Sequence, residues 1–263
     1  MFADVALVPQ EIEHMPLERF SGVAVIDVLR ATTTIATALA NGARGVVPVA
    51  TPEEALAWRS AGTGVLLGGE RGARRIPGFD LGNSPFEYSA ERVAGRLIVL
   101  TTTNGTLAFR RVLAAASGRS PELIAACLRN ASACARHLWE RATAAGGDVL
   151  LVCAGTNGWF SLEDAFCAAV LLRDMAELGS IEYGDGARAA VRLGAGAGDA
   201  FEELSQSRHG RRLLDLGFHE DIAYCAERSV CTAVPRLEAG VLVNAGGSLE
   251  PDGTAGAVHG RGE

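Results

Sequence analysis

The stretch GVAVIDVLRATTTIA, residues 22–36, decides the fold. Its first part is apolar without alternation, which predicts a strand buried on both faces within a parallel sheet. Asp27 stands near the carboxyl end of that strand, Arg30 follows in the next turn, and an alanine-rich helix is predicted from about residue 33 to residue 40. In open α/β sheets, ligands bind outside the carboxyl ends of the strands. The stretch therefore predicts both an α/β fold and the position of its site.

The side chains of this turn suit a phosphate ester and a divalent cation. Asp27 offers a carboxylate, either as a metal ligand or as a nucleophile, and Arg30 offers a guanidinium fork to a phosphoryl group. Thr32, Thr33 and Thr34 add hydroxyl groups beside the positive end of a helix. The alternatives at this point are a helix cap for Asp27 and the threonines, and a surface salt bridge for Arg30.

Two later strand–turn–helix units repeat the plan, and the three read IDVLRATTT, VLTTTNGT and VCAGTNGWFSLED. The TNG triplet recurs at residues 103–105 and 156–158, from either an old duplication or convergence on one useful turn. Because such turns meet at one edge of a parallel sheet, we expect them to share a single cleft. In the second unit, Thr102, Thr103, Asn104, Gly105 and Thr106 are candidate neutral donors to the substrate.

Four further candidates follow predicted strands. Glu70 and Arg71 come after a strand predicted at residues 64–67 and are a metal ligand with an anion ligand, or only a surface ion pair. Glu163 and Asp164 open a helix and are metal ligands, or capping residues together with Ser161.

A long irregular segment, residues 72–85, contains Asn83 and Ser84 as candidate substrate ligands, although Ser84 equally fits an N-cap. Asp185, Ser207, His209 and Asp221 lie in a charged helical region, and we expect them to be solvated or structural.

Composition limits the chemistry. The net charge of −7 argues against a nucleic-acid partner, because phosphate backbones require basic faces. All 24 basic residues are arginine, which excludes a Walker lysine and a Schiff-base lysine. The six cysteines form no C-x-x-C pair, so we expect reduced core residues rather than a zinc site. The chain shows neither a membrane span nor a signal-peptide pattern, and we expect a cytoplasmic protein.

The predicted architecture is a three-layer αβα fold with a mostly parallel sheet. Residues 1–180 are expected to form the α/β core that carries the main motifs. Residues 181–244 are expected to be helical and to return two closing strands, at 229–234 and 237–243, and residues 245–263 are a predicted flexible tail. A homodimer is the default expectation from the frequency of cyclic dimers.

Taken together, DVLRATTTI, LGGERG, GFDLGNSP, TTTNGT and CAG…FSLED, in this order over roughly residues 4–243, resemble the 2-phosphosulfolactate phosphatase family. The resemblance implies magnesium-dependent hydrolysis of 2-phospho-3-sulfolactate to 3-sulfolactate and phosphate, a step of coenzyme M synthesis in methanogens. Other 2-phosphorylated hydroxy acids are alternative substrates, because the family also occurs in organisms that do not make coenzyme M.

For this chemistry we expect Mg²⁺ on Asp27, Glu70 and Glu163 or Asp164, with Arg30 and Arg71 on the anionic groups of the substrate. Two alternatives are a non-catalytic module that binds a phosphorylated or sulfonated metabolite, and a phosphotransferase or lyase.

Overall fold

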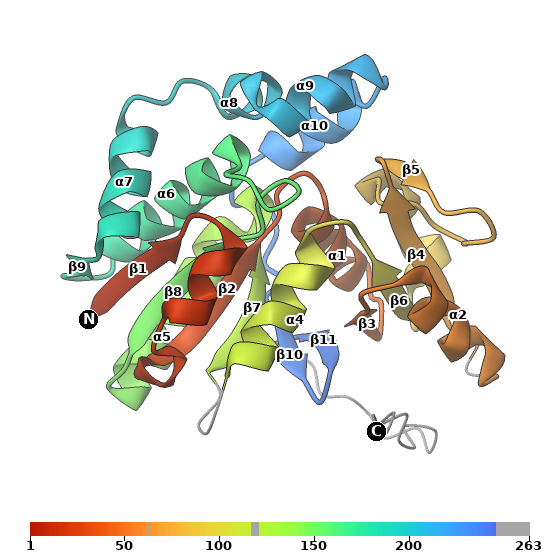
Figure 1. Cartoon of the computed structure of the whole chain (residues 1–263), viewed down its shortest axis with the longest axis horizontal. Helices are drawn as coiled ribbons and strands as arrows, with labels where there is room; N and C mark the ends of the chain where they lie inside the picture. Colours follow the sequence, from red (N-terminus) through yellow and green to blue (C-terminus); the bar gives the residue numbers. More distant parts are fainter. Residues whose placement is uncertain (63, 117–120, 246–263) are drawn as a thin grey trace.

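The structure, a computed structural model, describes residues 1–62, 64–116 and 121–245. All but the first residue of the predicted flexible tail lies outside these ranges. Eleven strands form one sheet in the order β5-β4-β6-β3-β11-β10-β7-β2-β8-β1-β9 (Figure 1). The strands are β1 Phe2–Ala6, β2 Phe20–Ile26, β3 Gly45–Pro48, β4 Leu66–Arg71, β5 Arg74–Arg75, β6 Leu97–Thr101, β7 Glu122–Ala126, β8 Asp148–Cys153, β9 Glu182–Tyr183, β10 Pro235–Glu238 and β11 Val241–Asn244.

Helices connect most of these strands. The α-helices are α1 Ala31–Ala40, α2 Pro52–Ser60, α3 Ala90–Val93, α4 Gly105–Ala115, α5 Ala131–Ala145, α6 Leu162–Ala176, α7 Asp185–Ala195, α8 Ala200–Gln206, α9 Arg208–Asp215 and α10 His219–Ala226. Short 3₁₀ helices are η1 Pro9–His14, η2 Leu17–Arg19, η3 Pro85–Glu87 and η4 Leu128–Asn130. None of the helices in the described ranges is long and apolar enough to span a membrane.

The sheet consists of two parallel blocks, one antiparallel hairpin between them, and the short edge strand β5, which pairs antiparallel with β4. Strands β7, β2, β8, β1 and β9 form the first parallel block, and β3, β6 and β4 form the second. The hairpin β10–β11 lies between them and pairs antiparallel with both neighbours. Each block meets the hairpin at one residue pair, Arg236 with Ile124 and Leu242 with Val46. The last strands of the described chain therefore join the two halves of the sheet.

The two closing strands lie later in the chain than the sequence pattern predicts. Residues 229–234 do not form a strand, because the amides of Ser229 and Cys231 donate to the carbonyls of Leu128 and Arg129 at η4. The hairpin occupies residues 235–244 instead, and its turn places Ala239 and Gly240 at positive φ.

Strand β2 is the centre of the core, and all seven of its residues are buried. Ala24 and Ile26 face one apolar cluster with residues of α5, α6 and α7, while Val23 and Val25 face a second with residues of α1 and α4. A strand covered on both faces explains its unbroken apolar sequence. The expected α/β fold, with helices on both sides of a mostly parallel sheet, is confirmed. All six cysteines are free, and five are buried.

Helices α8, α9 and α10 form a cover near the carboxyl ends of the first block (Figure 1). Helices α8 and α9 are separated at Ser207, which caps α9, since its Oγ accepts from the amide of Gly210 at 2.9 Å. Leu204, Leu213 and Ile222 pack in the same apolar cluster as Ile26 of β2. This packing brings the charged residues of α9 and α10 toward the end of β2.

Candidate active site

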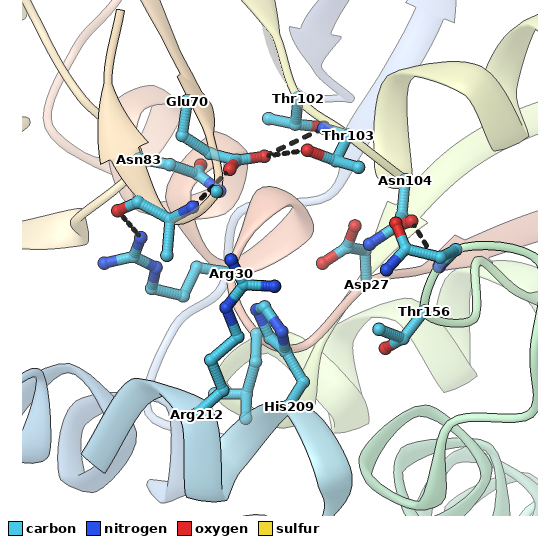
Figure 2. A pocket seen from close by; sticks show the side chains of 14 residues that line it. Asp27, Arg30, Glu70, Asn83, Thr102, Thr103, Asn104, Thr156, His209 and Arg212 are labelled. Carbon is cyan, nitrogen blue, oxygen red and sulfur yellow. Dashed lines mark hydrogen bonds between the residues drawn. The ribbon is translucent and has the colours of Figure 1, made fainter. Parts of the chain in front are cut away.

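A cavity opens where the loops of the two parallel blocks meet α9 (Figure 2). The turn after β2, the end of β4, both TNG turns and α9 all contribute to its wall. Its lining residues are Asp27, Leu29, Arg30, Glu70, Gly72, Ala73, Asn83, Thr102, Thr103, Asn104, Thr156, Asn157, His209 and Arg212. Seven of the candidates expected from the sequence are among them: Asp27, Arg30, Glu70, Asn83, Thr102, Thr103 and Asn104.

Asp27 is held by the first turns of two helices. Its Oδ1 accepts from the amide of Ala31 at 3.2 Å, at the start of α1. Gly105 begins α4, and a Cβ atom there would lie 2.8 Å from Asp27 Oδ2 and 2.7 Å from the Cβ of Ala31. Only glycine allows this approach without a shift of the backbone or of the carboxylate. Gly105 thus positions Asp27 and does not line the cavity itself.

Burial raises the pKa of Asp27 to about 7. The amide of Ala31 opposes this shift, and the negative charges of Glu70 and Glu163 add to it. A buried carboxylate that resists ionisation is a strong site for a cation, because a positive charge removes the cause of the shift.

The threonines after β2 hold the turn together. The hydroxyl groups of Thr32, Thr33 and Thr34 donate to the carbonyls of Asp27, Val28 and Asn83 at 2.8, 2.9 and 2.9 Å. None of the three lines the cavity. The structure therefore gives them a structural role in place of the predicted contacts with the substrate.

Arg30 is 2% exposed and is engaged within the protein. Its Nη1 donates to Asp221 Oδ2 at 2.5 Å, its Nη2 donates to the carbonyl of Ala73 at 3.0 Å, and its guanidinium lies 4.3 Å from the ring centroid of Phe218. Arg30 is therefore a buried link between the turn after β2, the β4–β5 turn and α10. The salt bridge of Arg30 is thus buried and not on the surface as the alternative interpretation had it, and Asp221 is structural, one of the two roles expected for it.

Ser84 also belongs to this link. Its Oγ donates to Asp221 Oδ1 at 2.9 Å, and it makes no capping bond to the 3₁₀ helix η3 that follows. The predicted N-cap is therefore wrong, and Ser84 does not line the cavity.

Strand β4 extends to Arg71, beyond the predicted end at residue 67. Glu70 Oε1 accepts from both the amide and the hydroxyl of Thr103 at 2.8 Å, and its Oε2 accepts from the amide of Ala73 at 2.8 Å. The guanidinium of Arg71 donates to the carbonyls of Glu70 and Ala50 and to Thr101 Oγ1. Arg71 lies outside the cavity lining, so its predicted contact with the substrate lacks support from its position.

The two TNG turns meet, as the repeated pattern predicts. The side-chain oxygen of Asn104 accepts from the amide of Asn157 at 2.9 Å. Thr102 and Thr106 cap each other across the start of α4, each hydroxyl accepting from the other's amide at 3.2 Å. Thr106 therefore supports the turn from outside the cavity lining. The repeat at 156–158 is the signal that could have placed Thr156 and Asn157 among the candidates.

Glu163 and Asp164 lie buried behind the cavity. Asp164 accepts from the amides of Val28 and Gly155, both at 3.0 Å, which ties the turn after β2 to the turn after β8. Burial, with the charge of Glu163, raises the pKa of Asp164 well above its usual range, and burial also raises the pKa of Glu163. Ser161 makes no capping bond, so the predicted capping pair is wrong.

The predicted metal shell of Asp27 and Glu70 with Glu163 or Asp164 is not assembled, since neither Glu163 nor Asp164 lines the cavity. Within the residues that the structure describes, no three His, Cys, Asp or Glu side chains are placed to hold a metal ion together. A smaller donor set does fit Mg²⁺. Asp27 and Glu70 both line the cavity, and the buried amide oxygen of Asn83 has no hydrogen-bond partner. Mg²⁺ commonly takes one or two carboxylates and completes its shell with water and substrate oxygens.

Two residues of α9 were not among the candidates. His209 and Arg212 line the cavity, and Figure 2 shows both side chains pointing from α9 toward the loops that carry Asp27 and Glu70. Burial, together with the charge of Arg30, lowers the pKa of His209 to about 4, so its imidazole is neutral at physiological pH. His209, which the sequence pattern assigned to solvated or structural residues, becomes a further candidate through its position at the cavity wall. A charged helix gives no local signal that one of its turns faces a site.

The sequence of the chain is similar to known proteins over most of its length. The family described as 2-phosphosulpholactate phosphatase matches residues 6–240 of the chain. The chain belongs to this family. Three relatives within the 2-phosphosulfolactate phosphatase family are each named probable 2-phosphosulfolactate phosphatase. The protein of Thermotoga petrophila is 48% identical over 220 residues, which cover 83% of this chain and 90% of that protein.

The protein of Deinococcus radiodurans is 44% identical over 236 residues, which cover 89% of this chain and 95% of that protein. The protein of Carboxydothermus hydrogenoformans is 41% identical over 245 residues, which cover 92% of this chain and 97% of that protein. The chain thus spans nearly the full length of these relatives, and the resemblance of its motifs to the 2-phosphosulfolactate phosphatase family is confirmed.

Proposed function

We propose that the protein is a magnesium-dependent phosphatase that hydrolyses 2-phospho-3-sulfolactate, or a related 2-phosphorylated hydroxy acid, to the hydroxy acid and phosphate. The observation that carries the proposal is the cavity that Asp27 and Glu70 line together with neutral polar residues and the guanidinium groups of Arg30 and Arg212. Membership of the 2-phosphosulfolactate phosphatase family supports the reaction class.

In this proposal, Asp27 and Glu70 hold Mg²⁺ together with the Asn83 amide oxygen. When bound there, Mg²⁺ would supply positive charge to offset the charge of the phosphoryl oxygens. Asp27 acts as a metal ligand rather than as a nucleophile, because the sequence lacks the second aspartate, two residues later, that aspartyl-phosphate phosphatases use; Leu29 stands there.

The protein's own groups orient the phosphoryl group. Asn104 offers the NH2 group of its side chain at the cavity wall, whereas Thr103 donates both its amide and its hydroxyl hydrogen to Glu70 and so positions that carboxylate. The side-chain oxygen of Asn104 is fixed by the amide of Asn157, which joins the two TNG turns. Such fixed donors stabilise developing charge without reorganising during the reaction.

The test is phosphate release from 2-phospho-3-sulfolactate and from phospholactate, with Mg²⁺ and with EDTA. We expect release from phosphosulfolactate in Mg²⁺ and its loss in EDTA. Release that EDTA leaves unchanged would contradict the metal requirement. The absence of release from either ester by folded protein would contradict the phosphatase proposal and favour a binding module.

A further inference from the structure

Charged side chains reach the cavity from two sides. Asp27 follows β2, and Glu70 lies near the end of β4. Arg212 extends from α9 toward them (Figure 2), and its Nη2 lies 3.4 Å from where a Cβ atom on Gly72 would stand. Gly72 itself lines the cavity, so the guanidinium lies against the β4–β5 turn at the cavity wall.

The two arginines that line the cavity differ in their partners. Arg30 is neutralised by Asp221 and bound to the carbonyl of Ala73. Arg212 has neither a hydrogen bond nor an ion pair with any residue in the described part of the chain. Its positive charge is therefore available to a ligand, whereas that of Arg30 is already used.

His209 adds a neutral polar group beside Arg212. The two residues are three positions apart on α9, so they lie on the same face of the helix. The Nδ1 atom of His209 is buried and lacks a hydrogen-bond partner among the described residues. An unpaired buried polar atom is costly, which favours a ligand atom at this place.

We propose that Arg212, assisted by His209, binds the sulfonate group of the substrate. Arg212 is then the residue that selects substrates carrying that group. This inference rests on the proposed function for the identity of the substrate. If the phosphoryl group lies on the cation at Asp27 and Glu70, the α9 side of the cavity receives the acid group with the greater reach from phosphorus. In 2-phospho-3-sulfolactate the sulfonate sulfur is one bond further from phosphorus than the carboxylate carbon is.

The first test compares Arg212→Met with the wild type on phosphosulfolactate and on phospholactate, which lacks the sulfonate. Charge-assisted hydrogen bonds of this kind correspond to about a 10- to 100-fold change in an equilibrium constant. We therefore expect the ratio of kcat/KM for phosphosulfolactate to that for phospholactate to fall by about 10- to 100-fold, mainly through KM. Arg212→Lys should recover part of the ratio, since it keeps the charge but loses the planar fork.

A matched control is Arg211→Met. Arg211 lies on the same helix, is exposed, bonds to the carbonyl of Gln206 and does not line the cavity. It carries the same change in charge, and we expect the substrate ratio to stay within about twofold of the wild type. An equal fall in both variants would mean that only the overall field of α9 matters, and this would overturn the assignment.

A second test does not depend on turnover, so it separates this inference from the proposed function. Calorimetry measures the binding of 3-sulfolactate and of lactate to the wild type and to Arg212→Met, with Mg²⁺ present. We expect the wild type to bind 3-sulfolactate at least 10-fold more tightly than lactate, and the variant to lose that preference. Equal losses for both ligands would assign Arg212 to the carboxylate, and unchanged binding, or no preference in the wild type, would likewise overturn the proposal.

Discussion

Replacing Asp27 with asparagine distinguishes two effects of its negative charge. One is its contribution to phosphate release, and the other is the free energy of unfolding that its burial costs. The side chain keeps its shape and its bond from the amide of Ala31, but it can no longer ionise. We expect Asp27→Asn to abolish magnesium-dependent phosphate release, because the cation loses one of its two carboxylates. In the absence of metal, the same variant should be more stable than the wild type at alkaline pH.

The magnitude follows from the shifted pKa. The pKa of Asp27 rises from 3.8 to about 7 on folding. The folded state binds the proton of Asp27 more tightly than the unfolded state does. The contribution of this proton to the free energy of unfolding is therefore fully present below about pH 4 and is lost as the pH rises through 7. A shift of about 3 units corresponds to about 4 kcal/mol above pH 7. Asparagine removes this cost but loses about 1–2 kcal/mol, because its amide group cannot accept a hydrogen bond at the second oxygen position.

The assay is thermal unfolding in EDTA at pH 5 and pH 8. A net gain of about 2–3 kcal/mol at pH 8 predicts a rise in Tm of about 5–10 °C for a chain of this size, and most of that gain should vanish at pH 5. Asp215→Asn is the control, because Asp215 is exposed and lacks an ion pair within the described residues. Equal melting of the variant and the wild type at both pH values would refute the electrostatic reasoning, and near-normal turnover by the variant would refute the site.

Three other perturbations probe the supports of the site. Asp221→Asn leaves the charge of Arg30 buried without a counter-ion and should destabilise the protein by about 3–5 kcal/mol in urea unfolding; a cost below 1 kcal/mol would contradict the role of the pair. Gly105→Ala places a methyl group 2.7 Å from the Cβ of Ala31 and should cost about 1–3 kcal/mol and most of the activity, so a fully active variant would show that this approach is not required. The pKa of His209 is about 4 in the folded protein against 6.5 unfolded, so stability should be lost as the pH falls from about 6.5 to 4; His209→Gln should remove about 2 kcal/mol of the change between pH 7 and pH 5, and an unaltered pH dependence would argue against a buried neutral imidazole.

The sequence was most informative where one local pattern determines the structure. The unbroken apolar run of β2 can be satisfied only by burial on both faces, and this fixed the place of Asp27 at a strand end. The repeated TNG triplet correctly predicted that two distant turns meet, and Asn104 and Asn157 make that contact.

Other features depend on contacts that a local pattern does not encode. A threonine hydroxyl can donate to a substrate or to a carbonyl, and the choice at Thr34 depends on where the carbonyl of Asn83 lies. Residues 229–234 have the composition of a strand, yet the amides of Ser229 and Cys231 donate to carbonyl groups of η4 and not to a neighbouring strand. Arg212 and His209 reach the cavity only because α8–α10 pack near the strand ends, which their own sequence does not specify.

The hairpin β10–β11 has a consequence for the time at which the site is completed during synthesis. Asp27 belongs to one parallel block and Glu70 to the other, and in the sheet the two blocks are connected through residues 235–244. A nascent chain has made both carboxylates long before it makes this hairpin. The sheet that sets their relative position is closed only when residue 244 has left the ribosome, so a shorter nascent chain holds both halves of the cation site without the strands that align them.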